Sequence, residues 1–148
     1  MNADLLAEKL AIEELIARYN HAIDSLRMDD WLDCWTDDAV MDGIGQYLVG
    51  KAAIKVFADG YAQNYSNRMP GARHFTVNIV SNIVGDRATS FSYLQLWSTQ
   101  PKGPQMAFTG VYEDVLVKQD GRWRFKGRKM TQDKPPKSLD TKPEGASL

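Results

Sequence analysis

Apolar residues recur at helical spacing in the first half of the chain. Between Ile12 and Leu26 they follow one another at three- and four-residue steps, which predicts a helix with one buried face that begins near Ala3 or Asp4 and ends in the mid-twenties. A similar pattern predicts a further helix over residues 51–65. The apolar side of that helix contains Ala53, Ile54, Phe57 and Tyr61.

After Gly71 the pattern changes to an alternation of apolar and polar residues, which is typical of strands. Turn signals that contain glycine separate the alternating segments. Helices followed by long antiparallel strands predict an α+β fold, with the helices packed on one face of a curved sheet. The predicted long strands cover residues 74–84, 88–99, 106–118 and 122–131. Within the second of them, Phe91, Tyr93, Gln95 and Trp97 face one side of the sheet, and Ser92, Leu94 and Leu96 face the other.

Shorter elements are expected between the two helices. Asp29 or Asp30 is a candidate N-cap for a short helix that extends to residue 38. Two short strands are predicted after it, at 39–42 and 46–49. The glycines between them predict a tight turn rather than a phosphate-binding loop, because no third glycine or Lys-Ser/Thr pair follows.

Composition narrows the choice of functions. The chain has 148 residues and a formal net charge of -1, which gives no electrostatic footprint for nucleic acid or an anionic membrane. It contains no apolar run typical of a membrane span and no pattern of a signal peptide. Cys34 is the only cysteine, so an intrachain disulfide is excluded, and we expect a cytoplasmic protein. Residues 134–148 are polar and rich in proline, and we expect them to be disordered or draped over a neighbouring subunit.

Metal chemistry is not indicated, because the chain has only two histidines and one cysteine, at spacings that match no zinc site. His74, at the start of a predicted strand, is either a hydrogen-bonded structural histidine or a catalytic base. His21 lies outside the apolar stripe, and we expect it to face solvent. Asp24 also lies away from the centre of the stripe, so it is either a solvated acid at a helix end or a residue of a pocket behind the helix.

The sequence leaves two interpretations open for several other polar and aromatic residues. Arg128 and Lys129 are either charges at the rim of the fold or contacts to an anionic group. Tyr47 and Tyr93 are either aromatic residues at the edge of the core or hydroxyl donors in a pocket.

Five segments stand out in their order along the chain: Ala17–Asp24 with Trp31, Thr36–Val40, Gly50–Ile54, Arg73–His74 and Asp120–Arg128. Together they resemble the SnoaL-like, scytalone dehydratase-like branch of the nuclear-transport-factor-2-like (NTF2-like) superfamily. The resemblance covers roughly residues 5–133, and we expect residues 1–133 to form a single domain.

The resemblance implies a cone-shaped (cystatin-like) α+β barrel, in which three N-terminal helices pack on a strongly curved, mostly antiparallel sheet around a deep pocket. Bile-acid dehydratase and hexachlorocyclohexane dehydrochlorinase look similar as well. In such enzymes an aspartate late in the first helix pairs with the histidine that opens the first long strand, and Asp24 and His74 hold these positions. The chain lacks the second catalytic histidine of scytalone dehydratase and has Leu96 where the bile-acid enzyme has an aspartate. We expect the substrate site to contain Tyr19, Tyr47, Phe57, Tyr93, Leu96 and Arg128.

These features predict a cofactor-free lyase, with no metal, that acts on a small hydrophobic, cyclic or aromatic compound by dehydration, related elimination or a retro-aldol step. Two alternatives stay open: an isomerase or cyclase for a polyketide- or steroid-like substrate, and a non-catalytic module for ligand binding or assembly. The face of the sheet that carries Trp97 is a candidate interface for a homo-oligomer, either a dimer or a trimer.

Overall fold

The computed structural model describes residues 2–135, without the side chains of residues 65–68. In this part of the chain the helices are α1 (Ala3–Asp24), α2 (Met28–Asp33) and α3 (Lys51–Arg68). The strands are β1 (Trp35–Gly43), β2 (Gln46–Val49), β3 (Arg73–Val84), β4 (Arg87–Gln100), β5 (Gly103–Gln119) and β6 (Arg122–Gln132). The expectation for the C-terminal tail falls almost wholly on residues 136–148, which lie outside the described residues.

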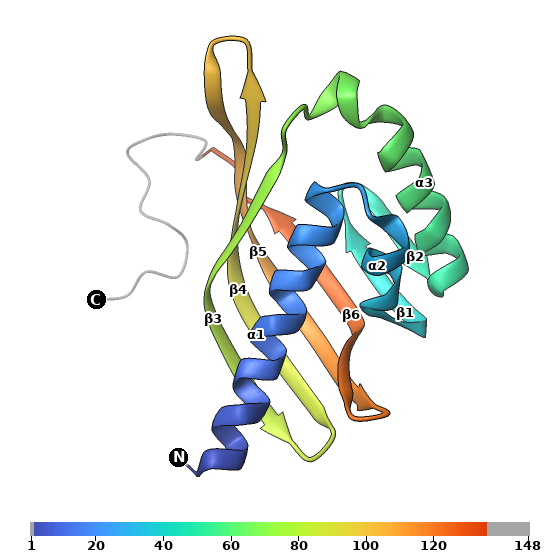
Figure 1. Ribbon diagram of the computed structural model, residues 1–148, viewed down its shortest axis with the longest axis vertical. Coiled ribbons are helices and arrows are strands. Elements are labelled where there is room, and N and C mark those ends of the chain that lie inside the picture. Colours follow the sequence, from blue (N-terminus) through green and yellow to red (C-terminus); the bar gives the residue numbers. More distant parts are fainter. Residues whose placement is uncertain (1, 136–148) are drawn as a thin grey trace.

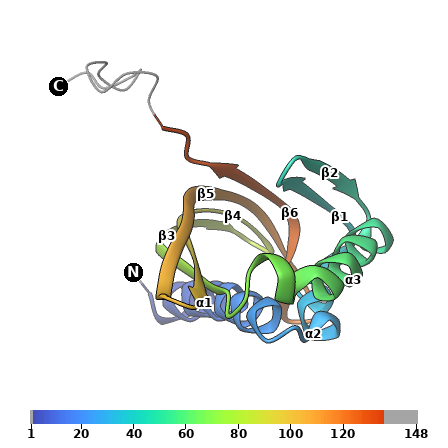
Figure 2. The ribbon, with the colours of Figure 1, turned by 90° about the horizontal axis from the view of Figure 1, so that it is seen from above.

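The strands form a 6-stranded sheet in the order β2-β1-β6-β5-β4-β3. Neighbouring strands are antiparallel except β1 and β6, which are parallel. The sheet bends around α1, which lies along its concave face, while α2 and α3 lie beside β1 (Figures 1 and 2). The predicted α+β class and the cone-shaped arrangement of helices on a curved, mostly antiparallel sheet are confirmed.

Helix α1 is defined by its two ends and its buried stripe. The side chain of Asn2 accepts a hydrogen bond from the backbone nitrogen of Leu5 at 2.8 Å, so it caps the first turn. At the other end, Arg27 N donates to the Ala22 carbonyl at 2.8 Å and Leu26 adopts a φ of 55°, the pattern of a Schellman motif. This motif stops the helix directly after Asp24. The stripe buries Ile12, Leu15, Ile16, Tyr19, Ala22 and Ile23.

The predicted second helix is wrong in its C-terminal half. Helix α2 ends at Asp33, its N-cap position is Arg27, and no side chain caps it. From Trp35 onward the chain is strand, because it pairs with β6: Trp35 lies opposite Phe125, and Phe125 N donates to the Cys34 carbonyl at 2.8 Å. This pairing fixes the start of the strand against β6, and the Trp35 side chain there is completely buried.

An aromatic cluster fills the space between α1, α2 and the sheet. Its ring centroids lie 5.3 to 6.1 Å apart, the range in which tilted and edge-to-face pairs are favourable. The cluster anchors α1 to β1 and β6 and so holds the C-terminal turn of α1 in place. Its members are Tyr19, Trp31, Trp35, Phe57 and Phe125.

Helix α1 also covers β3, which is one of the two edge strands of the sheet. Lys9 Nζ donates to the Ser81 carbonyl at 2.7 Å, and Asn20 Nδ2 donates to Thr76 Oγ1 at 3.0 Å. Asp24 accepts from the His74 backbone nitrogen at 2.9 Å. Side chains of α1 therefore take up polar groups that an edge strand would otherwise leave open.

Candidate active site

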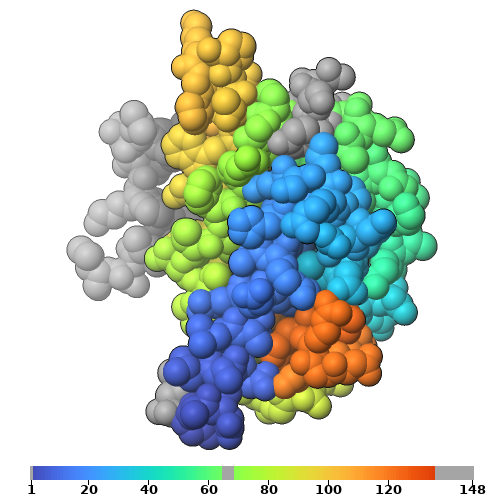
Figure 3. Space-filling model, in the orientation of Figure 1, coloured from blue at the N-terminus to red at the C-terminus, as the bar shows by residue number. Residues whose placement is uncertain are grey.

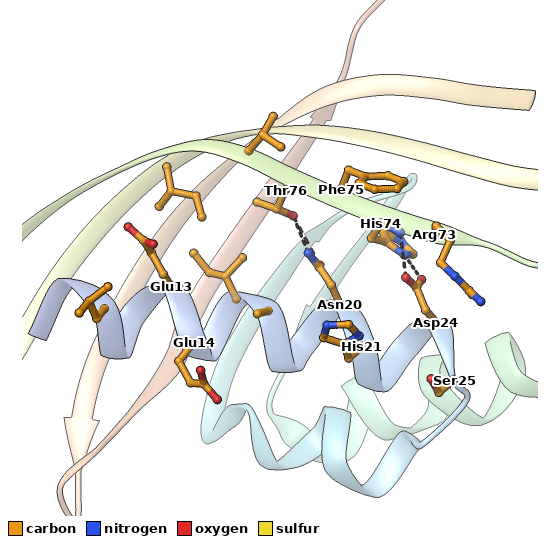
Figure 4. A pocket seen from close by; sticks show the side chains of 15 residues that line it. Glu13, Glu14, Asn20, His21, Asp24, Ser25, Arg73, His74, Phe75 and Thr76 are labelled. Atoms are coloured by element: carbon orange, nitrogen blue, oxygen red, sulfur yellow. Dashed lines mark hydrogen bonds and ion pairs between the residues drawn. The ribbon is translucent and has the colours of Figure 1, made fainter. Parts of the chain in front are cut away.

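Asp24 and His74 form the centre of the site (Figure 4). The Asp24 carboxylate accepts two hydrogen bonds from His74: Oδ1 lies 2.6 Å from ring Nδ1, and Oδ2 lies 2.9 Å from the backbone nitrogen. The histidine and aspartate side chains are only 8% and 9% exposed. Because a carboxylate can only accept, the neutral imidazole carries its proton on Nδ1 and keeps Nε2 as an acceptor. Asp24 is thus not a solvated acid, and it fixes both the position and the tautomer of His74.

Two local features bring the pair together. The Schellman motif ends α1 directly after Asp24, which places this carboxylate in the last turn, beside the start of β3. His74 is the second residue of β3, and the preceding turn is packed against the end of β4. Gly71 has a φ of 60°, and a Cβ added there would lie 2.9 Å from the Thr99 side chain. The turn therefore needs glycine both for its conformation and for its close approach to β4.

Two hollows meet at His74. An inner cavity of about 80 Å³ lies inside the curved sheet and is lined by His74 and by residues of α1, α3, β1, β4, β5 and β6. An outer groove of about 720 Å³ runs between α1 and β3, which lie side by side in Figure 3, and both Asp24 and His74 line it. Among the described residues, no side chain or backbone group is hydrogen-bonded to His74 Nε2. That nitrogen is therefore open to a bound molecule.

Arg128, which lines the inner cavity, belongs to a buried ion pair. Arg128 donates to Asp114 through Nε at 2.7 Å and through Nη2 at 2.8 Å, and Ser90 donates to the same carboxylate at 3.0 Å. The Arg128 and Asp114 side chains are 2% and 0% exposed. Burial alone would lower the pKa of Arg128, but the adjacent Asp114 outweighs it and raises that pKa, so the guanidinium stays charged.

One nitrogen of the Arg128 guanidinium, Nη1, does not take part in the ion pair with Asp114. This nitrogen is buried and has no hydrogen-bond partner within the described part of the chain. The guanidinium carbon lies 4.4, 3.9 and 4.1 Å from the ring centroids of Tyr19, Tyr112 and Phe125. Burial raises the pKa of Tyr19 and of Tyr112, so both phenols keep their protons and can act only as neutral hydrogen-bonding groups.

Comparison with known families assigns the fold. The family model described as the SnoaL-like domain matches residues 4–129. This chain belongs to the SnoaL-like family. A comparison with curated proteins found no match.

Solved structures similar to this SnoaL-like protein have the same fold. A variant of Rv3472, a protein of unknown function from Mycobacterium tuberculosis, is 30% identical over 89% of this chain and 75% of that chain, with a TM-score of 0.81. A Novosphingobium aromaticivorans protein named as a candidate scytalone dehydratase is 21% identical over 100% of both chains, with a TM-score of 0.78. A Catenulispora acidiphila protein solved in complex with S-DNPA is 22% identical over 86% of this chain and 94% of that one, with a TM-score of 0.76.

The cavity brings together most, but not all, of the residues expected at the site of this SnoaL-like protein. Tyr47 and Tyr93 are corrections: they are 68% and 50% exposed, and neither lines the inner cavity. Tyr93 projects from the outer face of β4 because alternation along the strand sends its neighbours inward, and Tyr47 lies on the short strand β2. Those that do line the cavity with His74 are Tyr19, Phe57, Leu96 and Arg128.

Sequence reasoning missed Asp114 and Tyr112. Both face the cavity side of β5, where every second residue from Gly110 to Leu116 is buried. An acid and a tyrosine at inward-facing positions of a predicted strand were the available signal, since a buried carboxylate needs a charged or hydrogen-bonding partner. Lys129, by contrast, is a rim charge that lies 3.8 Å from Glu113 at the surface.

The remaining chemically active side chains lie outside the cavity. His21 is exposed, as expected. Cys34 is buried, and burial raises the pKa of its thiol, which disfavours the reactive thiolate. Over residues 2–135, His, Cys, Asp and Glu do not gather into a group that could hold a metal ion. No helix in the described residues has the length and apolar character needed to cross a membrane.

Proposed function

We propose that this SnoaL-like protein is a cofactor-independent lyase in which His74, held by Asp24, is the general base. The observation that carries the proposal is the 2.6 Å contact between Asp24 Oδ1 and His74 Nδ1 beside a cavity that His74 also lines. A buried carboxylate stabilises the imidazolium that forms when Nε2 accepts a proton. Positioned acid–base groups of this kind supply a rate enhancement of about 10²–10⁴-fold.

The reaction that suits this arrangement is the loss of water from a carbon next to a C–H bond. Nε2 of His74 takes the proton from carbon, the electron pair of that C–H bond forms the new double bond, and the C–O bond breaks. The proton then passes to the departing hydroxide, which leaves as water and restores neutral His74. Arg128 Nη1 and the phenols of Tyr19 and Tyr112 are the groups that can stabilise negative charge on a substrate oxygen during this step.

The walls of the cavity favour a small and largely apolar ring compound. Apart from the polar groups named above, the lining is mainly aliphatic and aromatic, with Ile23, Leu94, Leu96, Phe57 and Phe108 among its members. Family membership and the scytalone dehydratase-like neighbour support small-molecule chemistry of this type. A retro-aldol loss of a hydroxymethyl group as formaldehyde would use the same base, which would then take its proton from the hydroxyl oxygen.

A screen of hydroxylated and halogenated ring compounds for new double-bond absorbance tests the proposal. For any compound that is converted, we expect His74→Ala and Asp24→Asn each to abolish turnover while circular dichroism shows an unchanged fold. His21→Ala is the matched control, because it removes the chain's other histidine, which is exposed and lines the outer groove but not the inner cavity, and it should retain full activity. Near-wild-type rates in His74→Ala and Asp24→Asn would refute the proposal, and rearranged products without loss of water would indicate an isomerase or cyclase.

We further propose that the protein is a homo-oligomer that associates through the outer face of its sheet. Large apolar side chains on that face are far more exposed than those of the concave face, which is the pattern of a protein interface. They are Phe75, Val77, Phe91, Tyr93 and Met106, which are 49%, 38%, 42%, 50% and 52% exposed.

A further inference from the structure

Two hairpins of this protein share one backbone geometry but differ in sequence. In the β5–β6 turn, Asp120 and Gly121 have φ values of 52° and 72°. In the β1–β2 turn, Ile44 and Gly45 have φ values of 55° and 72°. Positive φ at both central positions is the type I′ pattern, which strongly prefers Asn-Gly or Asp-Gly. The β5–β6 turn follows this preference, whereas the β1–β2 turn places a β-branched residue where such residues are strained.

Strain at Ile44 is not explained by packing in the core, because the residue is 65% exposed. The location of Ile44 between two hollows offers an explanation for the strained turn. Ile44 lines the inner cavity that contains His74 and also lines a second hollow of about 490 Å³ between the β1–β2 hairpin and α3. Figure 1 shows α3 beside this hairpin. The two hollows share Ile44, Phe57 and Tyr61, so these side chains form the partition between them.

The inner cavity is too small to hold a ring compound unless this partition moves. Its volume is about 80 Å³, whereas an engineered apolar cavity that accepts benzene has about 150 Å³. The hollow outside the partition is several times larger and opens between the hairpin and α3. Ile44 is the member of the partition that lies at the tip of a two-residue turn, so its side chain can be displaced without disturbing a helix.

We propose that Ile44 is the gate and size-selecting residue of the cavity: ligands enter between the β1–β2 hairpin and α3, and the displaced Ile44 side chain then packs against the bound molecule at the entrance. Asparagine or aspartate at position 44 would relieve the strain in the turn. Neither residue has the apolar side chain with which isoleucine covers the cavity. The proposal concerns access alone, and so it applies whether or not Asp24 and His74 perform the elimination.

A cysteine in the cavity wall measures access without any substrate. Leu96→Cys, or Met41→Cys if the first variant does not fold, introduces a reporter thiol that methyl methanethiosulfonate must enter the cavity to reach. Mass spectrometry of peptides separates this reporter from Cys34. In the reporter background, Ile44→Asn should raise the labelling rate about fivefold, because about a third of the surface of Ile44 is buried and would no longer be covered by an apolar side chain. The same substitution should raise Tm by about 3 to 5 °C, because it relieves the strained turn.

The β5–β6 turn provides the matched control. Asp120→Ile introduces the same residue at the same φ in a turn away from the cavity, so it should lower Tm and leave the labelling rate unchanged. If the reagent reached the reporter only through global unfolding, Asp120→Ile would speed labelling and Ile44→Asn would slow it. Either that result, an unchanged rate in Ile44→Asn, or a lower Tm in Ile44→Asn would overturn the proposal.

Discussion

Removal of the Asp114 carboxylate should be among the most destabilising single changes in this protein. Asp114→Asn keeps the size of the side chain but leaves the Arg128 guanidinium, which is 2% exposed, without its counter-charge. Two charge-assisted hydrogen bonds of 2.7 and 2.8 Å are lost or weakened with it. Breaking one partner of a buried ion pair costs about 3–5 kcal/mol. This is a large fraction of the 5–15 kcal/mol that separates a typical folded domain from its unfolded chain, as an order-of-magnitude comparison.

Urea unfolding followed by circular dichroism would measure the free energy of unfolding of Asp114→Asn against the wild type. Glu113→Gln is the matched control on the preceding residue of β5, because Glu113 pairs with Lys129 at 3.8 Å with both side chains more than half exposed. That variant should lose no more than about 1 kcal/mol. The double variant Asp114→Leu with Arg128→Met removes both charges, and it should be more stable than Asp114→Asn.

The result that would refute this reasoning is an additive cycle. If Asp114→Asn lost less than about 1 kcal/mol, or if the double variant lost the sum of the free energies lost by Asp114→Leu alone and Arg128→Met alone, then the buried pair would not be coupled as its geometry indicates. The floor of the cavity would in that case not depend on the ion pair.

Three further predictions concern the scaffold. Gly110→Ala should lose about 1–3 kcal/mol in urea unfolding, because an added Cβ would lie 2.5 Å from the Thr131 carbonyl oxygen; an unchanged midpoint would contradict this. Hydrogen bonds from Lys118 and from the Trp123 indole lower the pKa of Glu8 below its ordinary value of 4.5. The charged Glu8 therefore stabilises the fold fully above pH 4.5, and this stabilisation is lost as the pH falls through the lowered pKa. The difference in Tm between the wild type and Glu8→Gln should accordingly disappear in acid, and a difference that persists there would contradict this. Tyr93→Lys should reduce the sedimentation mass toward the 16.7 kDa of one chain, and a wild type that already sediments at that mass would rule out the outer-face interface.

Structural features that depend on residues close together in the sequence could be predicted. The apolar stripe of α1, the alternation along β4 and the turns at Gly85–Asp86 and Asp120–Gly121 depend on local periodicity and on glycine, and the structure confirms them. The proximity of Asp24 to His74 was inferred from resemblance, because helical periodicity alone placed Asp24 away from the buried stripe.

Structural features that depend on pairing between strands far apart in the sequence could not be predicted. The spacing of Trp31, Leu32 and Trp35 predicted a helix that continues past Asp33, but pairing with β6 and burial of Trp35 make the segment after Asp33 a strand. In β6 the alternation that buries Trp123 and Phe125 shifts by one residue, because Val115 pairs with Gly127 while Leu116 pairs with Phe125. This bulge turns Arg128 inward to Asp114, and no local pattern in the sequence marks it.

The state of the His74 ring tests the central claim most directly. The chain has only two histidines, so ¹⁵N NMR of the imidazole nitrogens resolves His74 from the exposed His21, which serves as an internal reference. We expect neutral His74 to carry its proton on Nδ1, bonded to Asp24, with Nε2 unprotonated, and we expect Asp24→Asn to change this pattern. A His74 protonated on Nε2, or one whose signals match those of His21 and do not respond to Asp24→Asn, would contradict it.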